Sequence, residues 1–139
     1  MKHISIHNYY FLAAAILSVL AAIGHAVYTQ TIIVPELAAS SLDKLNQDAN
    51  FMSWHLSTST SVVSAIGLFL MSVYKNRSAT IPLVALVAGI NAGRYLVFLG
   101  TGFLRNEELF KDALANTVFM ILYLGVMIWG MRYELRKNS

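Results

Sequence analysis

The sequence predicts an all-α integral membrane protein, folded as a four-transmembrane-helix bundle with up-down topology. Of its 139 residues, 57% are hydrophobic and only 12% are charged, and the mean hydropathy is +0.59. A soluble domain of this length needs more charged residues to form its surface. The apolar residues also gather in four runs, each long enough to cross a hydrocarbon core as a helix of roughly 20 residues. Cysteine is absent from the chain, which excludes thiolate metal sites, disulfide exchange and a cysteine nucleophile.

We expect a single domain over residues 1–139, with four spans that follow one another along the chain. Pro35 is expected to close the first span, and Pro82 to lie in the first turn of the third, where a missing N–H costs little. The first run is about 25 residues long, so we expect it to be a retained span rather than a cleaved signal peptide. Polar connections are expected at residues 36–50, 75–78 and 104–111. The spans cover approximately residues 10–34, 53–74, 80–100 and 113–133.

The basic residues predict the orientation. With four spans both termini share a side, and that side holds six basic residues against three on the other. Loops rich in Lys and Arg stay in the cytoplasm. We therefore expect both termini to be cytoplasmic, in a bacterial inner (cytoplasmic) membrane. The six residues are Lys2, Lys75, Arg77, Arg132, Arg136 and Lys137, and the three are Lys44, Arg105 and Lys111.

Polar side chains within the spans fall in the outer half of the predicted membrane. At 1.5 Å per residue, His25 and Arg94 lie about 13 Å and 9 Å below the outer ends of their spans. His55 and Asn116 lie near the outer starts of theirs. Ionisable residues inside a membrane are costly and mark functional sites, so we predict one ligand-binding cavity that opens to the outer side. Its predicted residues are His25, Tyr28, His55, Thr58, Asn91, Arg94, Tyr95 and Asn116.

The predicted ligand is an amphiphile such as a lipid headgroup, an isoprenoid or a quinone. No acidic residue lies deep in any span, and an unpaired buried charge is strongly unfavourable. Arg94 therefore needs Asp112 at the mouth of the fourth span, a ligand oxygen, or a path by which it snorkels to the outer headgroups. Arginine supplies directional donors to an oxyanion, and histidine donates or accepts near neutral pH.

Other classes of function stay open at this stage. Haem or a divalent metal would use His25 and His55, since imidazole is a suitable ligand for both. A membrane enzyme acting on a lipid would use His25 as acid–base and Arg94 to stabilise an oxyanion. An accessory subunit of a larger membrane complex is the remaining alternative. The size and the four spans resemble small multidrug transporters, but that family depends on an acid in its first span, where this chain has His25.

The expected partners are membrane lipids, and no nucleic acid. Small residues at helix faces let helices approach closely. Gly24 and the Gly89–Gly93 pair offer such faces, which could pack within the chain or against a second copy or a membrane-complex partner.

Overall fold

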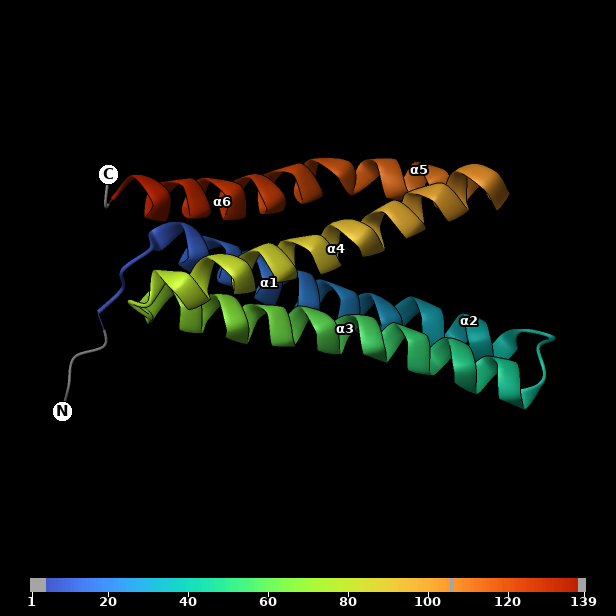
Figure 1. Cartoon of the computed structure of the whole chain (residues 1–139). Coiled ribbons are helices and arrows are strands. Elements are labelled where there is room, and N and C mark those ends of the chain that lie inside the picture. Colours follow the sequence, from blue (N-terminus) through green and yellow to red (C-terminus); the bar gives the residue numbers. More distant parts are fainter. Residues whose placement is uncertain (1–4, 106, 138–139) are drawn as a thin grey trace. The chain divides into compact units, whose positions relative to one another are not determined.

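The computed structural model describes residues 5–105 and 107–137, and nearly all of them are helical. No strand occurs within these two ranges, which confirms the predicted all-α fold class. The helical elements are α1 (Tyr9–Tyr28), the π-helix η1 (Thr29–Ile33), α2 (Val34–Ala39), α3 (Lys44–Val73), α4 (Arg77–Arg105), α5 (Glu107–Ala115) and α6 (Thr117–Arg136), as labelled in Figure 1.

Four helical segments are long and apolar enough to cross a membrane. Many of their large apolar side chains are exposed, among them Val97 at 70% and Val63 at 68%. Apolar surface on this scale is rare on soluble monomers and marks contact with lipid or with another protein. The architecture is therefore that of a membrane-helix protein, as predicted. The four segments are Tyr9–Ala39, Lys44–Val73, Ser78–Arg105 and Phe110–Arg136.

The chain forms two compact units. One comprises Met1–Ala14 and Gly67–Ser139, and the other comprises Ala15–Ile66. The Ala15–Ile66 unit is a helical hairpin, in which the first helical segment lies beside α3 (Figure 1).

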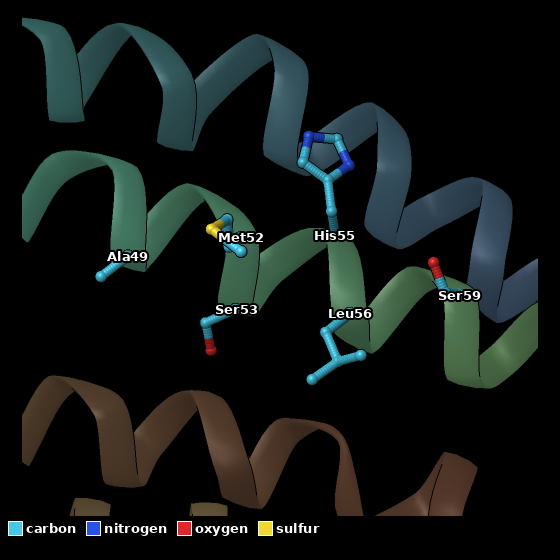
Figure 2. Close-up of a pocket in the computed structure, with 6 residues that line it drawn as sticks. All are labelled: Ala49, Met52, Ser53, His55, Leu56 and Ser59. Carbon is cyan, nitrogen blue, oxygen red and sulfur yellow. The ribbon is translucent and has the colours of Figure 1, made fainter. Parts of the chain in front are cut away.

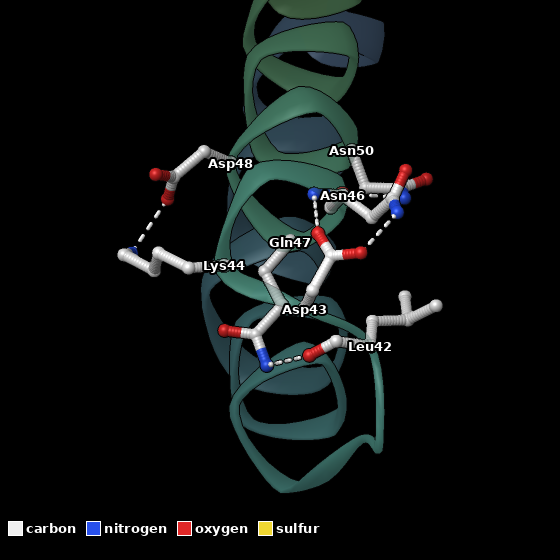
Figure 3. Close-up of polar contacts among 7 residues, drawn as sticks. All are labelled: Leu42, Asp43, Lys44, Asn46, Gln47, Asp48 and Asn50. Atoms are coloured by element: carbon white, nitrogen blue, oxygen red, sulfur yellow. Dashed lines mark hydrogen bonds and ion pairs between the residues drawn. The ribbon is translucent and has the colours of Figure 1, made fainter.

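The connection between α2 and α3 ends at Asp43, the N-cap of α3. Its Oδ1 accepts the N–H of Asn46 at 2.9 Å, and its Oδ2 accepts the Asn46 side-chain amide at 2.8 Å (Figure 3).

The first helical segment does not end at Pro35, so that expectation is wrong. The helix continues as α2 to Ala39, with Pro35 in the first turn of that element. Proline lacks an N–H and its ring clashes with the carbonyl four residues earlier. The π-helix directly precedes it, and the N–H of Val34 bonds to the carbonyl of Thr29, five residues back. This wider turn accommodates the proline, so the helix continues beyond Pro35.

The third long helix also starts earlier than expected. Pro82 lies inside α4 rather than in its first turn. The reason is that Asn76 begins the helix, because its carbonyl accepts the N–H groups of Ala79 and Thr80 at 3.2 Å and 3.0 Å. Its side-chain oxygen also accepts the N–H of Ser78 at 3.1 Å.

The expected connection at residues 104–111 is largely helical. α4 runs to Arg105, and α5 begins at Glu107. Lys111 pairs with Glu107 at 3.1 Å and with Glu108 at 3.0 Å, one turn apart on α5. Acidic residues in a first turn and pairs at this spacing both stabilise a short helix. α4 then packs against α5 and α6 (Figure 1).

The start of α1 is fastened to the end of α6. Asn8 is only 1% exposed, and its Oδ1 accepts the N–H groups of Tyr10 and Phe11 at 3.0 Å and 3.2 Å. Its Nδ2 donates to the carbonyl of Gly130 at 3.1 Å and to the Glu134 carboxylate at 3.0 Å. One amide thus caps α1 and also joins it to α6.

Close packing at glycine occurs at Gly130, a position that the sequence did not indicate. A Cβ added there would lie 2.5 Å from Cε1 of Phe11. A Cβ added to Gly24, Gly89 or Gly93 would meet nothing within 4 Å. Close helix approach at these three residues is therefore not found within either unit.

Candidate functional site: an aromatic cluster and a hollow on the hairpin

The eight predicted site residues divide between the two units. Their convergence on one cavity stays a prediction, and each set has surroundings of its own. His25, Tyr28, His55 and Thr58 belong to Ala15–Ile66, whereas Asn91, Arg94, Tyr95 and Asn116 belong to the other unit.

His25 and Tyr28 of α1 both meet Trp54 of α3. The imidazole of His25 stacks on the indole of Trp54, with ring centroids 4.7 Å apart and ring planes inclined at 27°. Tyr28 lies against the same indole at 6.0 Å and 47°. His25 and Trp54 are half-buried, whereas Tyr28 is 46% exposed. These three residues, the aromatic cluster, present both flat ring surface and polar ring atoms to a ligand.

Helix geometry explains the first half of this cluster. His25 and Tyr28 are three residues apart, so they share one face of α1. The π-helix begins at the next residue, Thr29, whose buried hydroxyl donates to the carbonyl of His25 at 2.7 Å. Single π turns occur frequently at functional sites. The sequence at residues 29–33 gave no local signal for this turn. The contact between His25 and Trp54 was not predicted either, because the two residues lie on different helices.

An open hollow of about 460 Å³ lies along α3. Most of its lining is on the exposed face of this helix, opposite the face from which Trp54 meets α1. Figure 2 shows the His55 side chain directed toward α1, and Trp54 lies between two of the lining residues in the chain. Three lining residues are polar and three are apolar. Mixed linings of this kind suit a ligand with a polar head and an apolar remainder. The hollow is lined by Ala49, Met52, Ser53, His55, Leu56 and Ser59.

His55 and Thr58 have contacts within α3 itself. The His55 ring meets Phe51, one turn earlier, edge to face at 4.2 Å and 71°. The Thr58 hydroxyl donates to the carbonyl of Trp54 at 3.4 Å. Hydroxyls that bond four residues back serve their own helix. His55 is thus the better placed of the two for a ligand, because it lines the hollow.

The hairpin carries little positive charge. Residues 15–66 contain one basic residue, Lys44, and three acids, Glu36, Asp43 and Asp48, so their formal net charge is +1 − 3 = −2. The Lys44 ammonium is paired with Asp48 at 2.6 Å (Figure 3). The backbone N–H and then the side-chain amide of Asn46 lower the pKa of Asp43 below its ordinary value. Its negative charge therefore persists into acidic solution.

Two predicted residues of the other unit serve a helix junction. The Tyr95 hydroxyl on α4 contacts the Thr117 hydroxyl and donates to the carbonyl of Ala113 at 3.4 Å. Asn116 separates α5 from α6, and its side-chain amide donates to the carbonyl of Asp112 at 2.8 Å. These contacts hold α4 to the α5–α6 junction and satisfy polar groups there.

Arg94 is exposed on α4 and forms no ion pair within residues 5–105 and 107–137. The possible pair with Asp112 is therefore not formed. Consecutive helix residues differ by about 100° in direction, so Arg94 and Tyr95, which contacts α5 and α6, do not share one face of α4. Asn91 donates its side-chain amide to the carbonyl of Val87 at 2.9 Å.

The structure groups no three His, Cys, Asp or Glu side chains closely enough for a metal ion in the part of the chain that it describes. A haem or metal site at His25 and His55 stays a prediction, as does a catalytic role for His25 and Arg94.

No known protein family, characterised protein or solved structure matches this chain.

Proposed function

We propose that this chain is an integral membrane protein that binds an amphiphile at the Ala15–Ile66 hairpin. The polar head of the ligand lies at the aromatic cluster, and its apolar part runs along α3. One observation carries the proposal: the hairpin combines a half-buried histidine–tryptophan stack with an open hollow on α3 that is lined by both polar and apolar side chains.

Different residues of the hairpin contact the head and the tail of the ligand. Tyr28 and His55 supply polar ring atoms for the head, and histidine can donate or accept a hydrogen bond. Met52 and Leu56 are 68% and 69% exposed, and they offer apolar surface to a tail. Methionine adapts its shape to irregular apolar partners, which suits a flexible chain.

The orientation is part of the proposal. The distribution of basic residues supports cytoplasmic termini in a bacterial inner membrane, which would place the hairpin connection, residues 40–43, on the outer side. Reporter fusions at the C-terminus and in the connection should give opposite signals. Matching signals would refute this orientation.

The binding proposal is tested by extracting lipids from the purified protein and identifying them by mass spectrometry. Wild-type protein in mild detergent should retain one amphiphile well above its abundance in the membrane. Trp54→Leu and His25→Phe should lose most of it, because the first removes the indole and the second removes the imidazole nitrogens.

Trp129→Leu is the matched control. Trp129 lies on α6, outside the hairpin, and is 63% exposed, so its replacement should leave the retained amphiphile unchanged. Circular dichroism would establish that all variants keep their helical content. Equal lipid profiles for wild type, Trp54→Leu and Trp129→Leu would refute binding at the hairpin.

A further inference from the structure

We infer that two arginines near the end of α6, Arg132 and Arg136, bind the headgroup phosphate of an anionic phospholipid such as phosphatidylglycerol. Both belong to the unit that comprises Met1–Ala14 and Gly67–Ser139, whereas the proposed amphiphile site belongs to the hairpin. This inference therefore goes beyond the proposed function, and either can fail without the other.

The two arginines lie side by side on the helix. Arg132 and Arg136 are four residues apart in α6, so their side chains share one face. Both are exposed, and neither forms an ion pair in the part of the chain that the structure describes. Arginine presents a planar fork of N–H donors that matches two oxygens of a phosphate. Two such forks on one face can hold a single phosphodiester group.

The acid between the two arginines does not neutralise them. Glu134 is two residues from each, and at about 100° per residue it lies on nearly the opposite side of α6. There its carboxylate accepts the side-chain amide of Asn8 at 3.0 Å. Glu134 is half-buried, whereas Arg132 and Arg136 are exposed. The exposed side of this part of α6 thus carries positive charge without a carboxylate.

The surrounding end of the unit is also basic. The backbone N–H groups of His7 and Asn8 both bond to the carbonyl of Ser72, at 2.8 Å and 3.1 Å. The start of α1 therefore meets the end of α3 as well as the end of α6. Clusters of basic residues at the ends of membrane helices attract anionic lipid headgroups. The charged residues of residues 72–77 and 130–137 are Lys75, Arg77, Arg132, Arg136 and Lys137, against Glu134 alone.

The face that carries the arginines continues along α6 as apolar surface, where acyl chains can lie. Val118, Ile121 and Leu122 are exposed on this face. Gly125 lies between them and the arginines, and a Cβ added there would meet nothing within 4 Å, so an acyl chain can approach the backbone. Ile121 precedes Arg132 by eleven residues, or about 16 Å, which is close to half of a roughly 30 Å hydrocarbon core. A lipid of one leaflet can therefore place its phosphate at the arginines and its chains on this face.

Trp129 can report the lipid at this face. It is exposed and lies three residues before Arg132 on the same side of α6. The chain has two tryptophans, so Trp54→Phe leaves Trp129 as the only one. This variant is reconstituted into phosphatidylcholine vesicles that contain equal amounts of either phosphatidylglycerol or phosphatidylcholine with brominated acyl chains, which quench tryptophan on contact. The quenching should correspond to a preference of about fivefold or more for phosphatidylglycerol.

Variants of the basic residues, made in the Trp54→Phe protein, locate the preference. Arg132→Gln and Arg136→Gln should each lower it several-fold, and the double variant should abolish it. Both side chains are exposed, so these variants should keep the helical content of the parent by circular dichroism. Lys75→Gln is the control, because it removes the same charge from the turn between α3 and α4, and it should leave the preference nearly unchanged.

Two results would overturn the inference. Equal quenching by the two brominated lipids in the Trp54→Phe protein would mean that no anionic lipid is selected at this face. Equal losses of preference in Lys75→Gln and Arg136→Gln would mean that the attraction belongs to the basic end as a whole, with no site at the two arginines.

Discussion

Replacing Asn8 with alanine should destabilise the protein by about 2–3 kcal/mol. The Asn8 side chain is 1% exposed and caps α1 through the N–H groups of Tyr10 and Phe11. Loss of an N-cap of this kind costs about 1 kcal/mol. The side chain also donates to the Gly130 carbonyl and to the Glu134 carboxylate, and losing these two bonds adds roughly 1–2 kcal/mol.

Unfolding of the detergent-solubilised protein by dodecyl sulfate, followed by circular dichroism, measures this cost. Asn8→Ser keeps a capping oxygen and lacks the amide donor, so it should lose about half as much. Asn50→Ala is the control, because Asn50 is exposed and donates only to its own helix, and it should change stability by less than about 0.5 kcal/mol. If Asn8→Ala is no more destabilised than Asn50→Ala, the link between α1 and α6 does not contribute to stability.

Three further predictions concern other parts of the chain. Gly130→Ala should reduce the free energy of unfolding by roughly 1–3 kcal/mol and so lower the thermal midpoint, because its Cβ would lie 2.5 Å from Phe11. Gly125→Ala has nothing within 4 Å of the added Cβ, and it should be neutral or stabilising by up to about 1 kcal/mol. The pKa of Asp43 is lowered by its hydrogen bonds from Asn46, so the capping contribution is present above its unfolded pKa and is lost as pH falls through the folded one. Protection from hydrogen exchange at the start of α3, measured relative to the intrinsic rate at each pH, should fall in that acidic range, and Asp43→Asn should abolish this change. Arg94 lies outside the hairpin, so Arg94→Lys should fold normally and keep the copurified amphiphile. Arg94→Leu should fold as well.

Each of these three predictions has a result that would contradict it. Equal midpoints for Gly130→Ala and Gly125→Ala would mean that Phe11 moves aside at little cost. Protection factors at the start of α3 that stay constant over this pH range would mean that the Asp43 carboxylate does not stabilise the cap. Loss of most copurified amphiphile from a folded Arg94→Lys would mean that the planar guanidinium binds a ligand oxygen, and it would contradict a site confined to the hairpin.

The long apolar helices could be predicted from the sequence because run length alone determines whether a helix can cross a membrane. Helix ends were less predictable, because they depend on local partners. Pro35 was expected to stop a helix, but the π turn before it carries the chain onward to Ala39. Glu107 and Glu108 were read as part of a charged connection, but their pairs with Lys111 stabilise a helix there.

The candidate site was predictable in part. His25 and Tyr28 were identified by their spacing on one face, and the structure shows that both meet Trp54. Trp54 itself was missed because the stack joins residues 29 positions apart, which no helical period reveals. The bonds of Asn8 to Gly130 and Glu134 could not be predicted for the same reason, because they join distant parts of the chain. Its capping of α1 is local and follows the N-cap preference for asparagine, but it was missed.

The π-helix at Thr29–Ile33 also has an evolutionary consequence. A π turn holds one residue more than an α turn, so the faces of α2 are rotated by about 100° from the pattern set by α1. A descendant that deleted one residue here would regain a regular helix, but its Pro35 would then meet the carbonyl of the preceding turn. Homologues of this chain should therefore keep or lose the extra residue and the proline together, and their alignment should show a one-residue gap at this position.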